Sequence, residues 1–170
     1  IGQGSLFTND FSPSTDLQTG SGFGRNRPTV DMQEAYEDGD LRYEISMGAT
    51  YMNLEGEIVE ARHVRKYQSD LAVENDSDIN FVVFRYADVL LMLAEALGET
   101  PESYDLINEV RDRAGLPDID ASTPGTFEEK LLHERRVELA FENHRWPDLK
   151  RFGATGLVPD AETFITGTRE

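Results

Sequence analysis

The sequence predicts a mainly α protein that also contains a small β-hairpin and irregular loops. Apolar residues recur at helical spacing in residues 81–97, and the segments 101–114 and 126–142 both open with helix-capping residues. The first 28 residues are instead rich in Gly, Ser, Thr, Asn and Pro and show no sustained apolar period. We therefore expect a single domain over residues 1–170, with an irregular region at 1–80, a helical core at 81–153 and a tail at 154–170.

Length and charge narrow the classes of partner. A chain of 170 residues is long enough for one domain with a hydrophobic core. Its formal net charge of -17 repels phosphate backbones, so we expect no nucleic-acid partner. The absence of cysteine excludes disulfides and Cys-ligated zinc, and no cofactor is expected. The chain begins at Ile1 without an initiator Met or an apolar leader, and we expect it to be part of a longer protein.

Two elements are predicted within the irregular region. Thr29 is a suitable N-cap for a short helix that ends at residues 38–40, where the sequence reads Asp-Gly-Asp. The stretch 45–67 suits a β-hairpin, with one strand at 45–53, a turn near Gly56 and a second strand at 58–67. The remainder of residues 1–28 is predicted to be loop or an extended lead-in.

The first long helix is predicted over residues 81–97. Its apolar residues spread around most of the helical circumference, and Arg85, Asp88 and Glu95 occupy one narrow polar face. We therefore expect this helix to be buried on nearly all sides. A bilayer crossing needs roughly 20 apolar residues, far more than the short charge-free run here, so a membrane span is not predicted.

Helix start and stop signals predict two further helices. Gly98 suits a C-cap, and Thr100 with Pro101 suits the start of a second helix, so the short connection makes the two helices antiparallel. On that helix one apolar stripe is predicted to face the core: Leu106, Ile107, Val110 and Ala114. Thr126 and Glu129 form a predicted capping box for a third helix that extends to about Glu142.

Three glutamates fall in one row of the third helix: Glu134, Glu138 and Glu142. Like charges at this spacing repel one another unless cations intervene. The arginines chosen as partners are Arg135, Arg136 and Arg145. A general acid/base pair of Glu134 and Glu138 is the alternative, but acids interleaved with arginines favour a structural salt-bridge network.

Neither candidate metal motif is complete. His133-Glu134 begins a His-Glu-x-x-His pattern, but Val137 stands where the second histidine is needed. Asp76 and Asp78 begin a calcium-loop pattern that lacks its required Gly and Glu further along. We therefore predict no metal site.

Trp146 has two interpretations. An exposed Trp can stack against a sugar ring, whereas a buried one contributes to the core. Leu149 and Phe152 follow at helical spacing and favour the core interpretation.

Three ordered blocks of this sequence, the last in two parts, resemble the C-terminal part of the SusD/RagB family. They are Arg85-Tyr-Ala-Asp-Val-Leu-Leu-Met-Leu-Ala-Glu-Ala96, Ile107-Asn-Glu-Val-Arg-x-Arg-Ala-Gly-Leu116, Glu134-Arg-Arg-x-Glu-Leu-Ala-Phe-Glu142 and Arg145-Trp-x-Asp-Leu-Lys-Arg151. The family comprises nutrient-binding lipoproteins of the outer membrane in Bacteroidetes, and the resemblance covers roughly residues 27–153.

The resemblance implies a fold, a function and partners. It implies tetratricopeptide-like helical hairpins, of which residues 85–114 resemble the last, followed by a more irregular region. It implies surface capture of oligosaccharides, or in some members peptides, without catalysis. The implied partner is a SusC-type TonB-dependent porin, and the implied membrane attachment is a lipid anchor that this chain does not contain.

The shared blocks are scaffold, so binding residues are sought from chemistry instead. Sugar sites use aromatic faces. The irregular region supplies Phe7, Phe23, Tyr43 and Tyr51, of which Phe23 and Tyr51 are the candidates chosen, although each also suits a packing role. Two other functions remain open, a helical-repeat scaffold that binds peptides or proteins and a glycoside hydrolase, which needs two opposed carboxylates.

Overall fold

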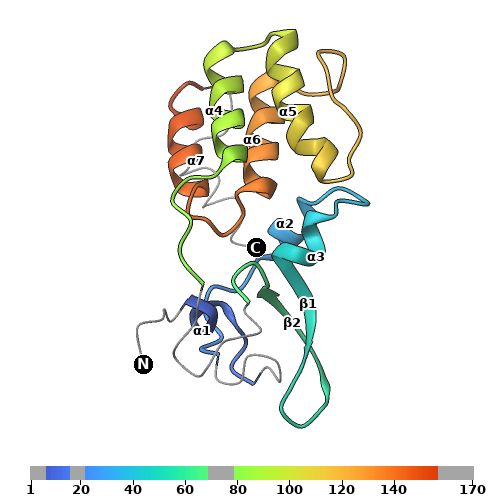
Figure 1. Ribbon diagram of the computed structural model, residues 1–170, viewed down its shortest axis with the longest axis vertical. Coiled ribbons are helices and arrows are strands. Elements are labelled where there is room, and N and C mark those ends of the chain that lie inside the picture. The colour runs from blue at the N-terminus through green and yellow to red at the C-terminus, as the bar shows by residue number, and fades with distance from the viewer. Residues whose placement is uncertain (1–6, 16–21, 69–78, 157–170) are drawn as a thin grey trace. The chain divides into compact units, whose positions relative to one another are not determined.

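The computed structural model describes residues 7–15, 22–68 and 79–156 (Figure 1). The chain divides into two compact units, the first made of residues 1–36 and 41–82 and the second of residues 37–40 and 83–170. The division near residue 82 lies close to the expected change from irregular region to helical core at 80/81. The expectation of a single domain stays a prediction, and each unit is described separately below.

The first unit is built around a β-hairpin. Strand β1 (Met47–Met52) pairs antiparallel with β2 (Ile58–Val64), from Met47 opposite Val64 to Met52 opposite Ile58. At the tip, Asn53 Oδ1 accepts hydrogen bonds from the backbone N–H groups of Glu55 and Glu57, at 3.1 and 2.8 Å. Gly56 adopts a φ of 80°, a left-handed conformation that glycine adopts without strain. The predicted hairpin and its turn are confirmed.

Among the described residues of the first unit, three short helices accompany the hairpin: α1 (Phe7–Phe11), α2 (Val30–Glu34) and α3 (Arg42–Ser46). The Thr29 side chain accepts a hydrogen bond from Met32 N at 3.1 Å, which confirms the predicted cap of α2. Helix α1 lies in a stretch that was predicted to be loop. Contacts with a distant residue stabilise this helix: Thr8 Oγ1 donates a hydrogen bond to the Tyr67 carbonyl at 2.8 Å, and Phe11 packs on the Tyr67 ring.

The described part of the second unit contains four longer helices: α4 (Tyr86–Leu97), α5 (Pro101–Arg113), α6 (Phe127–Glu138) and α7 (Arg145–Gly153). Helices α4 and α5 form the predicted hairpin, α6 packs on both, and α7 packs on α6 (Figure 1). Their apolar faces enclose the core of this unit, whose largest fully buried apolar side chains are Leu91, Ile107, Val110, Leu131 and Val137.

The predicted starts of α5 and α6 are confirmed by their capping contacts. Gly98 has a φ of 68°, and Thr100 Oγ1 accepts a hydrogen bond from Ser103 N at 3.2 Å. Thr126 and Glu129 form the reciprocal capping box, with Thr126 N donating to Glu129 Oε2 at 2.8 Å. Each of these contacts satisfies backbone groups that a helix end leaves unpaired.

Helix α4 differs from its prediction in length and in burial. It begins at Tyr86, because Arg85 is held in an extended conformation by hydrogen bonds to Glu138 and Glu142. Its side chains are buried on one side only, and Val89 and Leu93 remain 48% and 44% exposed. The expected burial on nearly all sides was wrong. The polar face was also misplaced, since Asp88 is buried in an ion pair with Arg135.

The turn between α6 and α7 corrects two further expectations. Helix α6 ends at Glu138 and not near Glu142, because Phe141 and Asn143 adopt φ values of 68° and 66° that reverse the chain. Trp146 is 50% exposed, so its predicted core position was wrong. The inward face of α7 is set by Asp148, which pairs with Arg135 and lies about 200° around the helix from Trp146.

Within the described residues, no helix combines the length and the apolar character needed to cross a bilayer.

Candidate functional site

Phe23, the first aromatic candidate, lies on the surface of the first unit. Its side chain is 41% exposed, and the Arg25 guanidinium carbon lies 5.1 Å from the centre of its ring. Its backbone N–H donates to the Asn9 carbonyl at 2.7 Å, which fixes the residue to α1. An anchored, half-exposed ring offers a face for stacking against a sugar.

Tyr51, the second candidate, lies on β1 and is partly exposed. Its hydroxyl forms a hydrogen bond with Thr15 Oγ1 at 2.9 Å, and its ring meets His63 edge to face at 5.8 Å. Phe23 and Tyr51 are therefore both attached to the segment 9–15 by hydrogen bonds. Their assignment as ligand contacts stays a prediction.

The glutamates Glu134 and Glu138 of α6 and Glu142, which follows that helix, form a buried ion network in the second unit. Glu134 is fully buried and pairs with Arg111 of α5 at 3.1 Å. Arg111 also donates to both carboxylate oxygens of Glu37, at 2.7 and 3.1 Å. Burial alone would lower the pKa of Arg111, but hydrogen bonding to Glu37 and the charge of Glu134 raise it, and its pKa is raised overall. Arg111 therefore stays charged.

The other two glutamates of the row bind arginines from other elements. Glu138 pairs with Arg85 and Arg113, and Glu142 pairs with Arg85 at 2.7 Å. Arg135, which was predicted to compensate the row, instead bridges Asp88 and Asp148 at 3.0 Å each. The structural-network interpretation is confirmed, but the choice of Arg135 as partner was wrong. An α-helix places i and i+1 about 100° apart, so Arg135 points away from the glutamate beside it.

This geometry does not suit acid/base catalysis by Glu134 and Glu138. Both carboxylates are buried and held by guanidinium groups, so neither is available to a substrate. His133 Nε2 lies 3.7 Å from Glu37, and burial lowers the pKa of His133. The described residues contain no group of three or more His, Asp or Glu side chains arranged to hold a metal ion, and Asp76 and Asp78 lie outside them.

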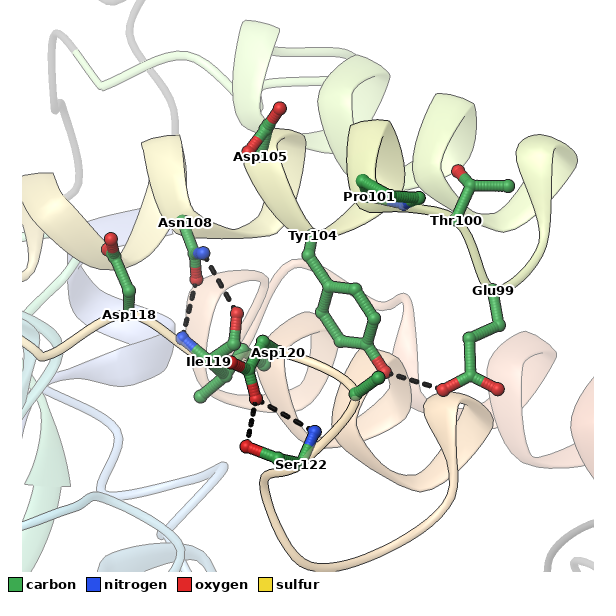
Figure 2. A pocket seen from close by; sticks show the side chains of 11 residues that line it. Glu99, Thr100, Pro101, Tyr104, Asp105, Asn108, Asp118, Ile119, Asp120 and Ser122 are labelled. Carbon is green, nitrogen blue, oxygen red and sulfur yellow. Dashed lines mark hydrogen bonds between the residues drawn. The ribbon is translucent and has the colours of Figure 1, made fainter.

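A pocket of about 570 Å³ lies between α5 and the loop 118–122 (Figure 2). Its lining combines apolar surface from Pro101, Ile119 and Ala121 with the carboxylates of Glu99 and Asp118. No sequence motif predicted this pocket. The only sequence signal is a concentration of acids at both ends of the second predicted helix, which by itself is typical of a solvated surface.

Tyr104 forms one wall of the pocket and is almost fully buried. Its hydroxyl donates to Glu99 Oε1 at 2.8 Å, as Figure 2 shows, and Lys130 Nζ donates to the same hydroxyl at 3.3 Å. Burial and the hydrogen bond to Glu99 together raise the pKa of Tyr104 to about 12. The phenol is therefore neutral at physiological pH and keeps Glu99 in position.

The opposite wall is held by hydrogen bonds, so the pocket is preformed. Asn108 binds both backbone groups of Ile119, donating to its carbonyl and accepting from its N–H at 2.9 Å each (Figure 2). Asp120 Oδ1 accepts hydrogen bonds from the Ser122 hydroxyl and N–H, and these bonds lower the pKa of Asp120. A preformed pocket binds ligands with a smaller entropic cost than one that must become ordered.

The fold is that of a class of protein built on tetratricopeptide-like helical hairpins with a small β-hairpin. Solved structures of the SusD superfamily share this fold. A SusD superfamily protein from Parabacteroides distasonis has a TM-score of 0.70 and 30% sequence identity, and the match covers 86% of this chain and 35% of that one. Surface glycan-binding protein A from Bacteroides thetaiotaomicron, solved in complex with laminarihexaose, also has a TM-score of 0.70, covering 95% of this chain and 40% of that one. Its identity of 22% shows a shared fold alone.

The model of the SusD family matches residues 7–168, and this chain belongs to that family. SusD-like protein P38 of Formosa agariphila is 34% identical over 141 residues, which cover 76% of this chain and 27% of the relative. SusD-like protein P2 of the same organism is 31% identical over 176 residues, covering 82% of this chain and 35% of the relative. The chain therefore spans about a third of the length of these relatives.

Proposed function

We propose that the full-length protein captures oligosaccharide or polysaccharide nutrients at the outer-membrane surface without cleaving them. In this proposal a lipid anchor holds the protein to the membrane, and the captured glycan passes to a SusC-type TonB-dependent porin. Membership of the SusD family carries the proposal. A structural relative that binds laminarihexaose supports it, and so do the buried, arginine-paired glutamates, which are not available as an opposed carboxylate pair.

The proposed sugar contacts are Phe23 and Tyr51. An aromatic ring that is half exposed presents an apolar face to the C–H groups of a sugar, while a phenol hydroxyl also bonds to sugar hydroxyls. Both residues are fixed to the segment 9–15 by hydrogen bonds, so their orientation costs little on binding.

The alternative function is a helical-repeat scaffold for peptides or proteins. Such scaffolds usually stack three or more repeats to form a concave surface. The α4–α5 hairpin is one such pair, so this alternative depends on repeats elsewhere in a longer protein. We retain it as the second candidate because the α4–α5 hairpin is a helix pair of the kind that such scaffolds stack.

Calorimetry of the full-length protein against a panel that includes laminarihexaose, other polysaccharides and peptides tests the proposed function. We expect glycan binding with no release of reducing sugar. Phe23→Ala and Tyr51→Ala should each weaken binding about twofold to tenfold, because an aromatic contact contributes about 0.5–1.5 kcal/mol beyond its buried area. The matched controls are Phe84→Ala and Tyr86→Ala, which remove exposed aromatic rings from the second unit.

Other outcomes of this experiment contradict specific parts of the proposal. Release of reducing sugar would establish a hydrolase. Binding of peptides but of no carbohydrate would favour the scaffold. Equal losses in the control variants would remove Phe23 and Tyr51 from the site while leaving glycan capture in place. Failure of the full-length protein to co-purify with a SusC-type porin encoded beside it would contradict the delivery step.

A further inference from the structure

We infer that the pocket between α5 and the loop 118–122 is a second carbohydrate subsite, which accepts uncharged or amine-bearing sugar units and rejects uronate and sulfated ones. This inference rests on the proposed function and adds to it a site and a substrate class. It is carried by three properties of the pocket: its preformed walls, its mixed apolar and acceptor lining, and its uncompensated negative charge.

The size and lining of the pocket match the two kinds of surface that a sugar presents. Its volume of about 570 Å³ falls within the roughly 300–1,000 Å³ of small-molecule sites. Pro101, Ile119 and Ala121 supply apolar surface for the C–H face of a sugar ring. Carboxylate oxygens beside them accept hydrogen bonds from hydroxyl groups, and a charged acceptor makes a stronger bond than a neutral one. The lining therefore suits a polyhydroxylated ligand.

The carboxylates of the pocket are available to a ligand. Glu99, Asp105 and Asp118 are exposed, and the described residues contain no arginine or lysine paired with them. Glu99 accepts the Tyr104 hydroxyl through one oxygen, Oε1, which leaves Oε2 available for a further bond. This contrasts with the buried acids of the same unit that arginines hold, such as Glu134, Glu138 and Asp88.

No cation in the lining offsets this negative charge. The described lining residues include no Lys, Arg or His. The nearby Lys130 is buried, and its Nζ donates to the Tyr104 hydroxyl and to the Asp120 carbonyl at 2.9 Å, so it stays behind the wall. A bound uronate or sulfate group would therefore meet several carboxylates, with the buried Lys130 as a nearby cation that it does not contact.

Coulomb's law gives the expected difference in affinity between an anionic sugar and its neutral counterpart. Two like charges about 8 Å apart in water weaken binding about twofold, and the effect grows as the pocket excludes water. Two or three carboxylates therefore predict at least about fivefold weaker binding of an anionic sugar than of its neutral counterpart at low salt. The difference should shrink as added salt screens the charges.

The test uses the full-length protein and three β-1,3-linked hexamers that differ only at C6. The probes are laminarihexaose, its C6-carboxylated form and its C6-amino form, at a pH where the carboxylate and the amine are both charged. Calorimetry should give the order amino, then neutral, then carboxylated, from tightest to weakest. The double variant Glu99→Gln/Asp118→Asn should reduce the ratio of neutral to carboxylated affinity by at least about threefold.

A matched control separates the pocket from the overall charge of the protein. Glu109→Gln/Asp112→Asn removes the same two charges from exposed positions of α5 outside the pocket lining. In the pocket variant, the amide groups that replace the two carboxylates still accept hydrogen bonds, so only the charge is lost. Thermal unfolding of both double variants checks that the fold is kept.

Three other results of this experiment would contradict the proposed subsite. A change in selectivity that is equal in the two double variants would overturn it, because the effect would then come from net charge. Binding of none of the three hexamers would overturn it as well, while capture of another glycan in the panel would leave the proposed function standing. If the protein binds no glycan at all, the proposed function and the subsite both fail.

Discussion

Arg135 is the residue that joins three helices of the second unit through charge. It projects from α6, where it is almost fully buried, and its guanidinium group binds Asp88 of α4 and Asp148 of α7. Arginine suits this position because its planar fork offers donors in two directions and keeps its charge when buried. The pairing fixes the rotation of α4 and α7 about their own axes.

Replacing Arg135 by Met should therefore destabilise the protein strongly. The substitution leaves the buried Asp88 without its cation and leaves Asp148 with Arg151 alone. Removing one partner of a buried pair typically costs about 3–5 kcal/mol. Chemical denaturation of the unaltered protein and of Arg135→Met gives the difference in the free energy of unfolding. The control is Arg25→Met, which removes an exposed arginine 3.9 Å from Asp10 and should cost below about 1 kcal/mol. Equal losses in the two variants would show that the buried network contributes little.

Tyr104 should make stability fall at high pH. The folded state holds its phenol proton more tightly, with a pKa of about 12 against a usual 10.0. This contribution is fully present below pH 10 and is lost as the pH rises through 12, and the difference of two pKa units corresponds to about 3 kcal/mol. Urea unfolding between pH 9 and 12 measures it. The Tyr104→Phe variant should lose less stability across this interval, and parallel curves for both proteins would refute the assignment.

At the scale of elements, helix α4 has two different faces. One packs its apolar and charged residues against α5, α6 and the ion network. The other exposes a row of apolar side chains, which comprises Tyr86, Val89, Met92, Leu93 and Leu97. Contiguous exposed apolar surface on a helix is typical of a surface that associates with another one.

The exposed row of α4 should cause the 170-residue chain to self-associate at micromolar concentrations. Leu93→Glu places a charge in the row and should weaken this association at least about tenfold, as sedimentation velocity would measure. Leu54→Glu introduces the same change at an exposed leucine in the hairpin turn and should have no such effect. A chain that is monomeric at all concentrations would contradict the prediction.

At the scale of the molecule, charge is distributed unequally between interior and surface. Buried acids of the second unit are matched by arginines, whereas exposed acids around the pocket are not, and the net charge is -17. Such a surface favours solubility and repels polyanions. Because the chain spans 27% and 35% of its two relatives, the proposed capture and delivery of glycans belong to the full-length protein.

Features that depend on local interactions were predicted correctly. The caps at Thr29, Thr100 and Thr126, the hairpin turn at Gly56 and the antiparallel pairing of α4 with α5 were all predicted correctly. Each depends on residues within a few positions of one another, so the sequence contains the whole cause. The order of the motifs likewise identified the family.

Only the tertiary structure decided which residues meet across helices. The rotation of α4 turns Asp88 inward, that of α7 turns Trp146 outward, and the partners of Glu134 and Glu138 come from other elements. The pocket likewise forms where α5 meets a loop that Asn108 holds in place, a contact between residues 11 positions apart. The sequence by itself determined helices α2, α4, α5 and α6, the starts of α5 and α6, and the family. The rotations of the helices, the ion pairs and the pocket depend on how the whole chain packs. Packing buries a charge only where an opposite charge is within reach, and no local sequence pattern specifies where that is.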